Sequence, residues 1–374
     1  MISSLKELIY DFFIHPMRLF FIMSGLFAIF GTIILIFNIG DFISFHKFIF
    51  IELFVSSAFV GFLLTAVSDW ADYKGSLLPY SVIGFILLIL ALSTQILGFN
   101  GSIFIAFLWS FIAITTLIWL IKAKNYDNFS LIFLLCFIAF IEFYGVIYEP
   151  KPYALIHCFM GGIILIGFRI STVLARLALD RKFKDNSYIF IPNPILKNIS
   201  YISLLALALC DILRLDNTTS GFICAGAGLI ILSQISQWHH RVFLSTHYTF
   251  IYYILLFGSG LIYLALGVDL LFGLNFTSTI LHGITIWSTI GFIFFVFNVS
   301  SLRHSGQATL NLPICGKIGI ILLAIATISK LFLAQIWDIF YITIPAILVG
   351  LLFLIFVGRY TIIYKNNPFT DDPE

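Results

Sequence analysis

The stretch that decides the fold is FTSTILHGITIWSTIGFIFFVFNVSSLRHSGQATLNLP, residues 276–313. It joins an apolar run, long enough to cross a bilayer as a helix, to a short polar connection. One histidine, His282, lies near the start of the run, and a second, His304, lies in the connection. At about 1.5 Å of rise per residue, a continuous helix separates the two by about 33 Å. They are therefore expected on opposite sides of a membrane, and they cannot bind one metal ion.

The rest of the chain shares this apolar character. Of its 374 residues, 61% are hydrophobic and only 10% are charged, against about 25% charged in an average soluble domain. So few charges cannot cover the surface of a water-soluble fold, and a net charge of +2 gives no support for nucleic-acid binding. Because backbone polar groups in lipid must be satisfied within each segment, the runs predict helices rather than barrel strands. We expect an all-α, polytopic membrane helix bundle.

Twelve spans are predicted within a single membrane domain of residues 1–374. Their approximate ranges are 17–38, 46–67, 77–96, 101–121, 129–148, 153–174, 198–214, 219–236, 247–267, 276–298, 312–333 and 338–362. Lys and Arg in short loops mark the cytoplasmic side. With both termini on one side, that side collects every Lys and Arg except Lys47, Lys151, Arg214 and Lys330. This asymmetry predicts that both termini lie in the cytoplasm.

The longest connection, residues 175–197, is also the most basic, and it lies at the midpoint. It separates six predicted spans (1–174) from six more (198–374). The segments GFRIST (167–172) and GRYTII (358–363) are weakly similar, which would indicate a structural repeat. The alternative is that arginine follows the last turn of many spans under the positive-inside rule. The connection is long enough for an interfacial helix, which Pro192 and Pro194 would end.

Ionisable residues inside bilayer-length apolar runs are functional candidates, because lipid makes them costly. His46, His157 and His282 are predicted in the outer half of three different spans. Imidazole is a common ligand of haem iron and copper, and bundles hold cofactors with side chains from facing helices. These three are the candidate metal ligands. Each has an alternative: His46 could contact lipid headgroups, and the other two could hydrogen-bond a backbone carbonyl.

The remaining polar residues support other hypotheses. His15, His239, His240, His247 and His304 stand beside polar loop residues on the predicted cytoplasmic side, as solvated loop histidines do. Glu52 and Glu142 lie within predicted spans, and two sets of six helices with membrane carboxylates would suit a proton-coupled secondary transporter. Glu52 is turned about 120° from His46 around its helix, which disfavours a pairing between them. A purely structural membrane scaffold is a further alternative. Phosphate-loop and hydrolase motifs do not occur in the sequence.

Four segments are similar to one known family, NnrS, which comprises twelve-span bacterial inner-membrane proteins. GFLLTAVSDW (61–70) resembles the family segment that follows a W-H-x-H-E-M motif, and GFRISTVLARLAL (167–179) resembles its Gly-Gly-Arg, Pro, Phe-Thr-Arg segment. LHGITIW (281–287) resembles its L-H-a-l-t-v-G segment, and RHSGQATL (303–310) its G-H-T-G-R-p-L segment. Order and spacing agree along nearly the whole chain.

The resemblance implies a haem- or copper-containing protein of the bacterial inner membrane that acts in nitric oxide metabolism or protection from nitrosative stress. It leaves open whether nitric oxide is only bound or also turned over, and it says nothing of oligomeric state. His46, His282 and His304 fall on motif histidines. Arg169 and Arg176 would supply positive charge on the cytoplasmic side, for example to haem propionates. The chain departs from the family pattern at five positions: Phe48, Ile49, Thr172, Arg303 and Gln307.

Overall fold

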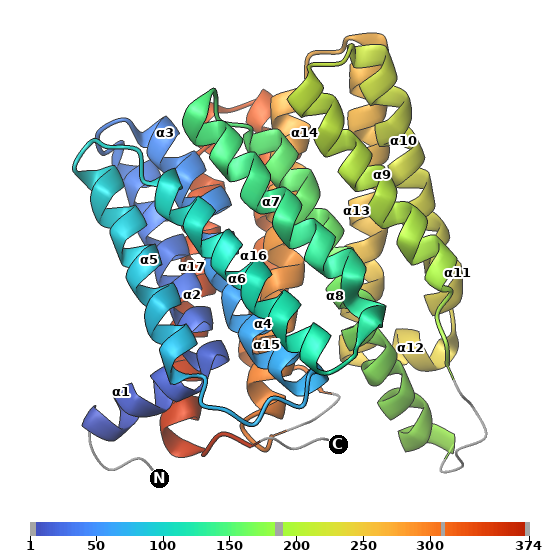
Figure 1. The fold of residues 1–374 in the computed structure, drawn as a ribbon. Helices are drawn as coiled ribbons and strands as arrows, with labels where there is room; N and C mark the ends of the chain where they lie inside the picture. Colours follow the sequence, from blue (N-terminus) through green and yellow to red (C-terminus); the bar gives the residue numbers. More distant parts are fainter. Residues whose placement is uncertain (1–4, 184–189, 308–310, 371–374) are drawn as a thin grey trace. The chain divides into compact units, whose positions relative to one another are not determined.

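The computed structural model describes residues 5–183, 190–307 and 311–370, and within these ranges every regular element is a helix. Twelve helices are long and apolar enough to cross a membrane, as predicted. The α-helices are α1 (Leu5–Ile14), α2 (Pro16–Phe37), α3 (Phe42–Lys47), α4 (Val55–Trp70), α5 (Leu78–Ile96), α6 (Ser102–Lys122), α7 (Phe129–Ile147), α8 (Pro152–Phe183), α9 (Pro194–Leu213), α10 (Asn217–Ser233), α11 (Ile235–Trp238), α12 (Arg241–Ser245), α13 (His247–Phe272), α14 (Thr277–Gly283), α15 (Gly291–Arg303), α16 (Ile314–Leu331) and α17 (Thr343–Asn366). Two π-helices, η1 (Phe48–Phe54) and η3 (Ile284–Ile290), and three short 3₁₀ turns, η2 (Tyr126–Asn128), η4 (Leu333–Gln335) and η5 (Asp338–Phe340), complete the set (Figure 1).

The chain divides into two compact units. Unit 1 comprises residues 1–155, 303–307 and 349–374, and unit 2 comprises residues 156–302 and 308–348. Helices α8 and α17 each contribute to both units. The division into 1–174 and 198–374 that the basic connection suggests stays a prediction, as does the repeat.

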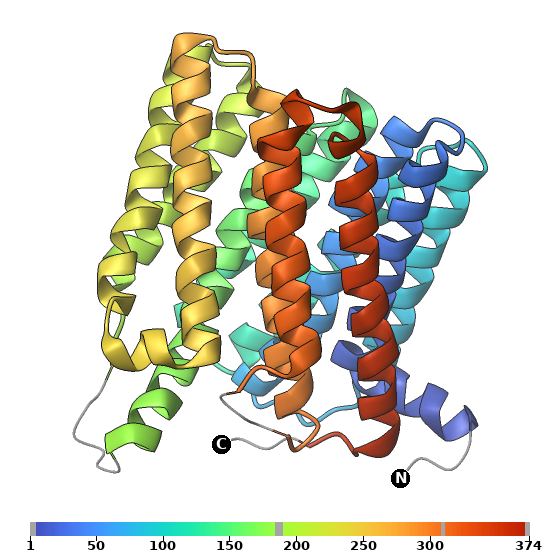
Figure 2. The same ribbon diagram turned by 180° about the vertical axis from the view of Figure 1, so that it is seen from behind.

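Unit 1 brings the two ends of the chain together. The side chain of Arg18, near the start of α2, donates hydrogen bonds to the backbone oxygens of Tyr364 (3.3 Å) and Asn367 (2.9 Å) at the end of α17. In Figure 2 the end of α17, in red, lies at the same end of unit 1 as the start of α2, in blue. An even number of spans requires this arrangement.

Unit 2 contains a pair of helices, α10 and α13, whose backbones nearly touch. A Cβ atom added at Gly228 would lie 2.5 Å from the backbone nitrogen of Leu264, and one added at Gly267 would lie 2.5 Å from that of Ala225. Small residues permit this approach, which drives helix association in lipid. Asp216 precedes α10 and accepts a hydrogen bond from the backbone N–H of Thr219 (2.9 Å). That bond holds the pKa of the Asp216 carboxyl below its usual range.

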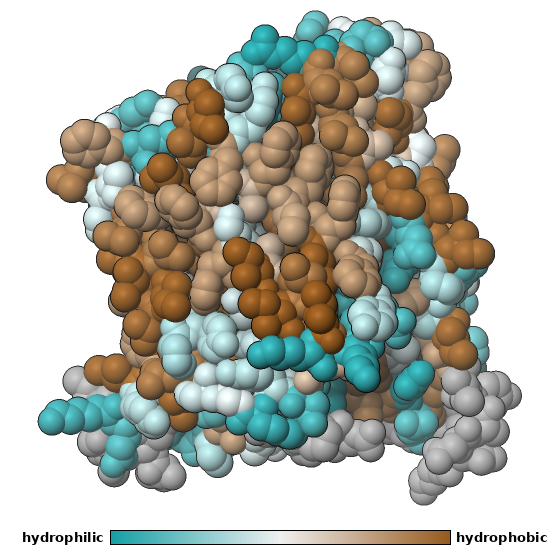
Figure 3. Space-filling model, viewed as in Figure 1, coloured by the Kyte–Doolittle hydropathy of each residue, from teal (hydrophilic) through white to brown (hydrophobic). Residues whose placement is uncertain are grey.

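The flanks of the helices are apolar. Figure 3 shows hydrophobic side chains along the helices and hydrophilic ones gathered toward the helix ends. On α6, for example, Phe107, Ile114 and Ile118 are exposed. Lipid rather than water solvates such side chains, so their exposure is what a membrane protein requires.

The basic connection is more helical than the sequence suggests. Helix α8 continues without a break to Phe183, so residues 175–183 extend a membrane span instead of forming a separate interfacial helix. No glycine or proline interrupts this segment, and Leu, Ala, Arg and Lys favour helix. Residues 184–189 lie outside the described ranges. As expected, no helix crosses Pro192 and Pro194: α9 begins at Pro194, and the side chain of Asn193 caps it.

Candidate functional site

Two spans replace part of their α-helix with a π-helix, each just after a candidate histidine. His46 lies in α3, two positions before η1, and His282 lies in α14, two positions before η3. Both π-helices have seven residues. Such segments are rare and are frequent at functional sites. The sequence carries no signal for them, because the residues are as apolar as those of an ordinary span.

His282 is half-buried, and a backbone carbonyl holds its ring. Its Nδ1 lies 2.7 Å from the backbone oxygen of Ser278, one turn earlier. Because a carbonyl can only accept, Nδ1 carries the proton and Nε2 carries the lone pair with which imidazole binds a metal. Histidine ligands in proteins commonly donate their other N–H in this way. The same bond also matches the alternative of a histidine satisfied by a carbonyl, so the geometry fits both roles.

His157 is buried, with 6% of its surface exposed, and it lies near the start of α8. Its Nδ1 lies 3.1 Å from the hydroxyl oxygen of Tyr263, a fully buried residue of α13. The Cys224 thiol donates to the backbone oxygen of the same tyrosine (3.3 Å). The partner of His157 is thus a hydroxyl from a distant span rather than a neighbouring carbonyl. Tyr263 has no motif that would single it out in the sequence.

The predicted metal site of His46, His157 and His282 draws on both units. His46 belongs to unit 1, where its ring centroid lies 5.2 Å from that of Phe50. The other two belong to unit 2. In the described part of the chain, no three His, Cys, Asp or Glu side chains gather as a metal ion would need. The three-histidine site therefore stays a prediction.

His304 lies in unit 1, in the turn that follows α15, and its ring contacts the C-terminal segment. Its Nδ1 lies 3.2 Å from the backbone oxygen of Thr370. Its ring stacks on Phe369 with centroids 4.9 Å apart, and the ring of His15 stacks on the same phenyl group at 3.9 Å. Two of the histidines assigned to the cytoplasmic side are therefore joined through one aromatic residue near the end of the chain.

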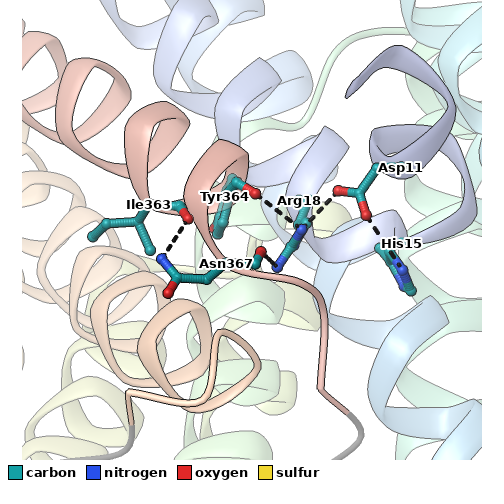
Figure 4. Close-up of polar contacts among 6 residues, drawn as sticks. All are labelled: Asp11, His15, Arg18, Ile363, Tyr364 and Asn367. Atoms are coloured by element: carbon teal, nitrogen blue, oxygen red, sulfur yellow. Dashed lines mark hydrogen bonds and ion pairs between the residues drawn. The ribbon is translucent and has the colours of Figure 1, made fainter. Parts of the chain in front are cut away.

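Beside this stack lies a buried ion pair (Figure 4). The Arg18 guanidinium donates to the Asp11 carboxylate at 2.7 Å, and its central carbon lies 5.4 Å from the Phe369 ring centroid. Asp11 in turn lies 3.7 Å from Nε2 of His15. Arg18 is fully buried. In the sequence, Arg18 is recognisable only as one of the charges on the predicted cytoplasmic side.

Arg169 and Arg176 lie on α8 in unit 2. They are seven positions apart and so share one face of the helix. Arg169 is half-buried and repels the nearby charge of Lys197, whereas Arg176 is exposed. His304 belongs to the other unit, so the cytoplasmic site predicted from these three residues stays a prediction.

One family model, described as NnrS protein, matches residues 11–366, nearly the whole chain and both units. The chain belongs to the NnrS family. With its twelve candidate spans, it is a multi-pass membrane protein of a family associated with nitric oxide. A comparison with curated proteins found no match.

The departures from the NnrS pattern have a structural consequence in η1. Phe48 and Ile49 stand where the family motif has its second histidine and its glutamate, and both are buried. A Cβ at Gly101 would lie 2.9 Å from the Phe48 ring, and one at Gly31 would lie 3.0 Å from the Ile49 side chain. In this NnrS protein, the two positions are thus filled by apolar packing against neighbouring helices. Of the motif's ligand-type side chains, His46 remains.

Proposed function

We propose that this protein binds haem within the membrane and acts in the response to nitric oxide or in protection from nitrosative stress. The observation that carries the proposal is the NnrS family match over residues 11–366. The geometry of His282 supports it, because the Ser278 carbonyl leaves the lone pair on Nε2, the atom with which a histidine would hold haem iron.

The chemistry of the bound group is simple. When bound, a ferrous haem would supply a binding site for nitric oxide, a small neutral molecule that concentrates in the bilayer. His282 would hold the iron, and the apolar helices of unit 2 would exclude water from it. Arg169 and Arg176, on one face of α8, lie toward the opposite side of the membrane from His282, so they would supply positive charge to propionates only in the separate cytoplasmic site predicted with His304.

The described residues do not fit a copper ion held by three protein ligands. No three suitable side chains gather in the part of the chain that the structure describes. In addition, Phe48 and Ile49 replace two ligand-type residues of the family motif with buried apolar side chains.

The proposal is tested with protein purified from membranes of cells grown with ample haem and copper. We expect a Soret band and, by metal analysis, iron in constant ratio to protein. His282→Ala should remove the band, whereas His304→Ala should keep it. His247→Ala is the matched control, since this exposed histidine begins α13.

Two outcomes contradict the proposal. Folded protein that contains neither haem nor stoichiometric metal excludes it. The second outcome is that His282→Ala and His304→Ala each remove the same band, although both variants still insert and fold. That result would contradict a haem site at His282 that is independent of His304. Anaerobic addition of nitric oxide with a reductant then separates stoichiometric binding from continued consumption.

A further inference from the structure

Two carboxyl groups lie within the membrane-spanning part of unit 1, on different helices. Glu52 belongs to η1, and Glu142 lies near the end of α7. Helix α6 packs against both elements. The side chain of Ser102, its first residue, hydrogen-bonds Glu52, and Glu142 lies close enough to Glu52 for two negative charges to repel each other. The two therefore form one pair beside the start of α6.

Each carboxyl group has a buried oxygen that lacks a hydrogen-bond partner in the described ranges: Oε2 of Glu52 and Oε1 of Glu142. Only 3% of the Glu142 surface is exposed. Moving an ionised carboxylate out of water costs on the order of several kcal/mol, even after the protein relaxes around it. A second negative charge in the same water-free site adds to that cost. The pair must therefore hold a positive partner.

A metal cation does not fit this position. Ca²⁺ and Mg²⁺ take about six or more oxygen ligands, and no third His, Cys, Asp or Glu joins the pair among the residues that the structure describes. A proton needs neither space nor further ligands.

The titratable groups of unit 1 are arranged asymmetrically around the pair. The elements packed against η1 and α7 carry His46, Lys47 and Tyr144 at the same end of the helices as the pair. The remaining titratable groups of these elements, and of α17, whose Phe353 packs on Phe54 of η1, lie mid-helix or toward the opposite end: Arg18, Asp69, Tyr80, Lys122, Tyr126, Asp127, Cys136, Arg359, Tyr360, Tyr364 and Lys365. By the charge asymmetry of the loops, the end that carries His46 faces outward. His46 stands between that surface and Glu52.

We infer that Glu52 and Glu142 form a proton-binding pair that takes up one proton from the outer side of the membrane. The proton adds to a carboxylate oxygen, and the O–H bond that forms donates to the facing carboxylate. The charge of the pair changes from −2 to −1, and nothing else is released or consumed. The site is a place at which protons enter the apolar interior of unit 1, and it does not depend on a bound cofactor.

Infrared difference spectroscopy of the full chain in lipid, recorded between two external pH values, tests this inference. We expect the C=O band of a protonated carboxyl group, shifted in D₂O. Because the two residues share one proton, Glu52→Gln and Glu142→Gln should each remove the band. Glu149→Gln is the control, since Glu149 is partly exposed and paired with Lys151, and it should leave the band in place.

A second measurement avoids substitutions. A hydrophobic carbodiimide adds to protonated carboxyl groups in apolar sites, and peptide mass spectrometry of the labelled wild-type protein should place the adduct on Glu52 or Glu142 and not on Glu149. Absence of both the band and the adduct overturns the inference. Two separate bands, each lost with only one substitution, would show independent carboxyl groups and overturn the pair.

Discussion

Arg18 shows how a buried charge is stabilised in this protein. Its guanidinium forms an ion pair with Asp11 and donates hydrogen bonds to the backbone oxygens of Tyr364, in α17, and Asn367, just after it. The rings of Tyr364 and Phe369 lie 5.1 Å and 5.4 Å from its central carbon. The planar fork of arginine can satisfy several acceptors at once, which the point charge of lysine cannot do. Arg18 therefore connects the first span to the last.

Replacing Arg18 by alanine should destabilise unit 1 strongly. The change leaves the Asp11 carboxylate and two carbonyl oxygens without this donor, and breaking a buried pair typically costs about 3–5 kcal/mol. Denaturant unfolding in detergent, followed by tryptophan fluorescence, measures the loss. Lys6→Ala on α1 is the control, because Lys6 is exposed. Equal stability of the two variants would show that Arg18 does not hold the ends of the chain together.

At the scale of elements, the contact between α10 and α13 depends on glycine at paired positions. Gly228 faces the backbone of Gly260 and Leu264, and Gly221 faces that of Gly267. The spacing of seven residues within each helix keeps these glycines on one face. Lipid gives no hydrophobic drive for helix association, so close backbone packing must supply it.

Gly228→Val and Gly226→Val form a matched pair for this contact. Both changes put a β-branched residue in the same helix, so their effects on helix propensity are similar. Only Gly228 lies against a backbone, whereas a Cβ at Gly226 meets nothing within 4 Å. Gly228→Val should lower the free energy of unfolding by about 1–3 kcal/mol more than Gly226→Val does. Thermal unfolding in the same detergent gives the difference, and indistinguishable transitions would refute the close contact.

At the scale of the whole molecule, the topology makes a prediction independent of function. Lys124 lies between α6 and η2, and Lys151 lies between α7 and α8, so a single span separates them. Reporter fusions after Lys124 should indicate the cytoplasm, and fusions near Lys151 the exterior. A fusion after residue 184, outside the described ranges, should again indicate the cytoplasm. Reversed signals would invert the assignment of sides and place the carboxyl pair in the cytoplasmic half of the membrane.

The amino-acid sequence by itself determined the class of the protein, its twelve spans and its family. These depend on local properties: the length of each apolar run, the prolines that limit helices, and short motifs such as LHGITIW. The predicted range 17–38 and the observed helix Pro16–Phe37 agree closely for this reason. In lipid the backbone must bond within its own segment, so an apolar run of sufficient length has few alternatives to a helix.

The tertiary structure alone decided which polar groups meet. It joined His157 to Tyr263, His304 and His15 to Phe369, and Glu52 to Glu142. It also decided that η1 and η3 follow His46 and His282 as π-helices. These features depend on which faces of distant helices pack together. Most residues around each span are apolar, so periodicity does not indicate those faces, and only the packed helices fix them.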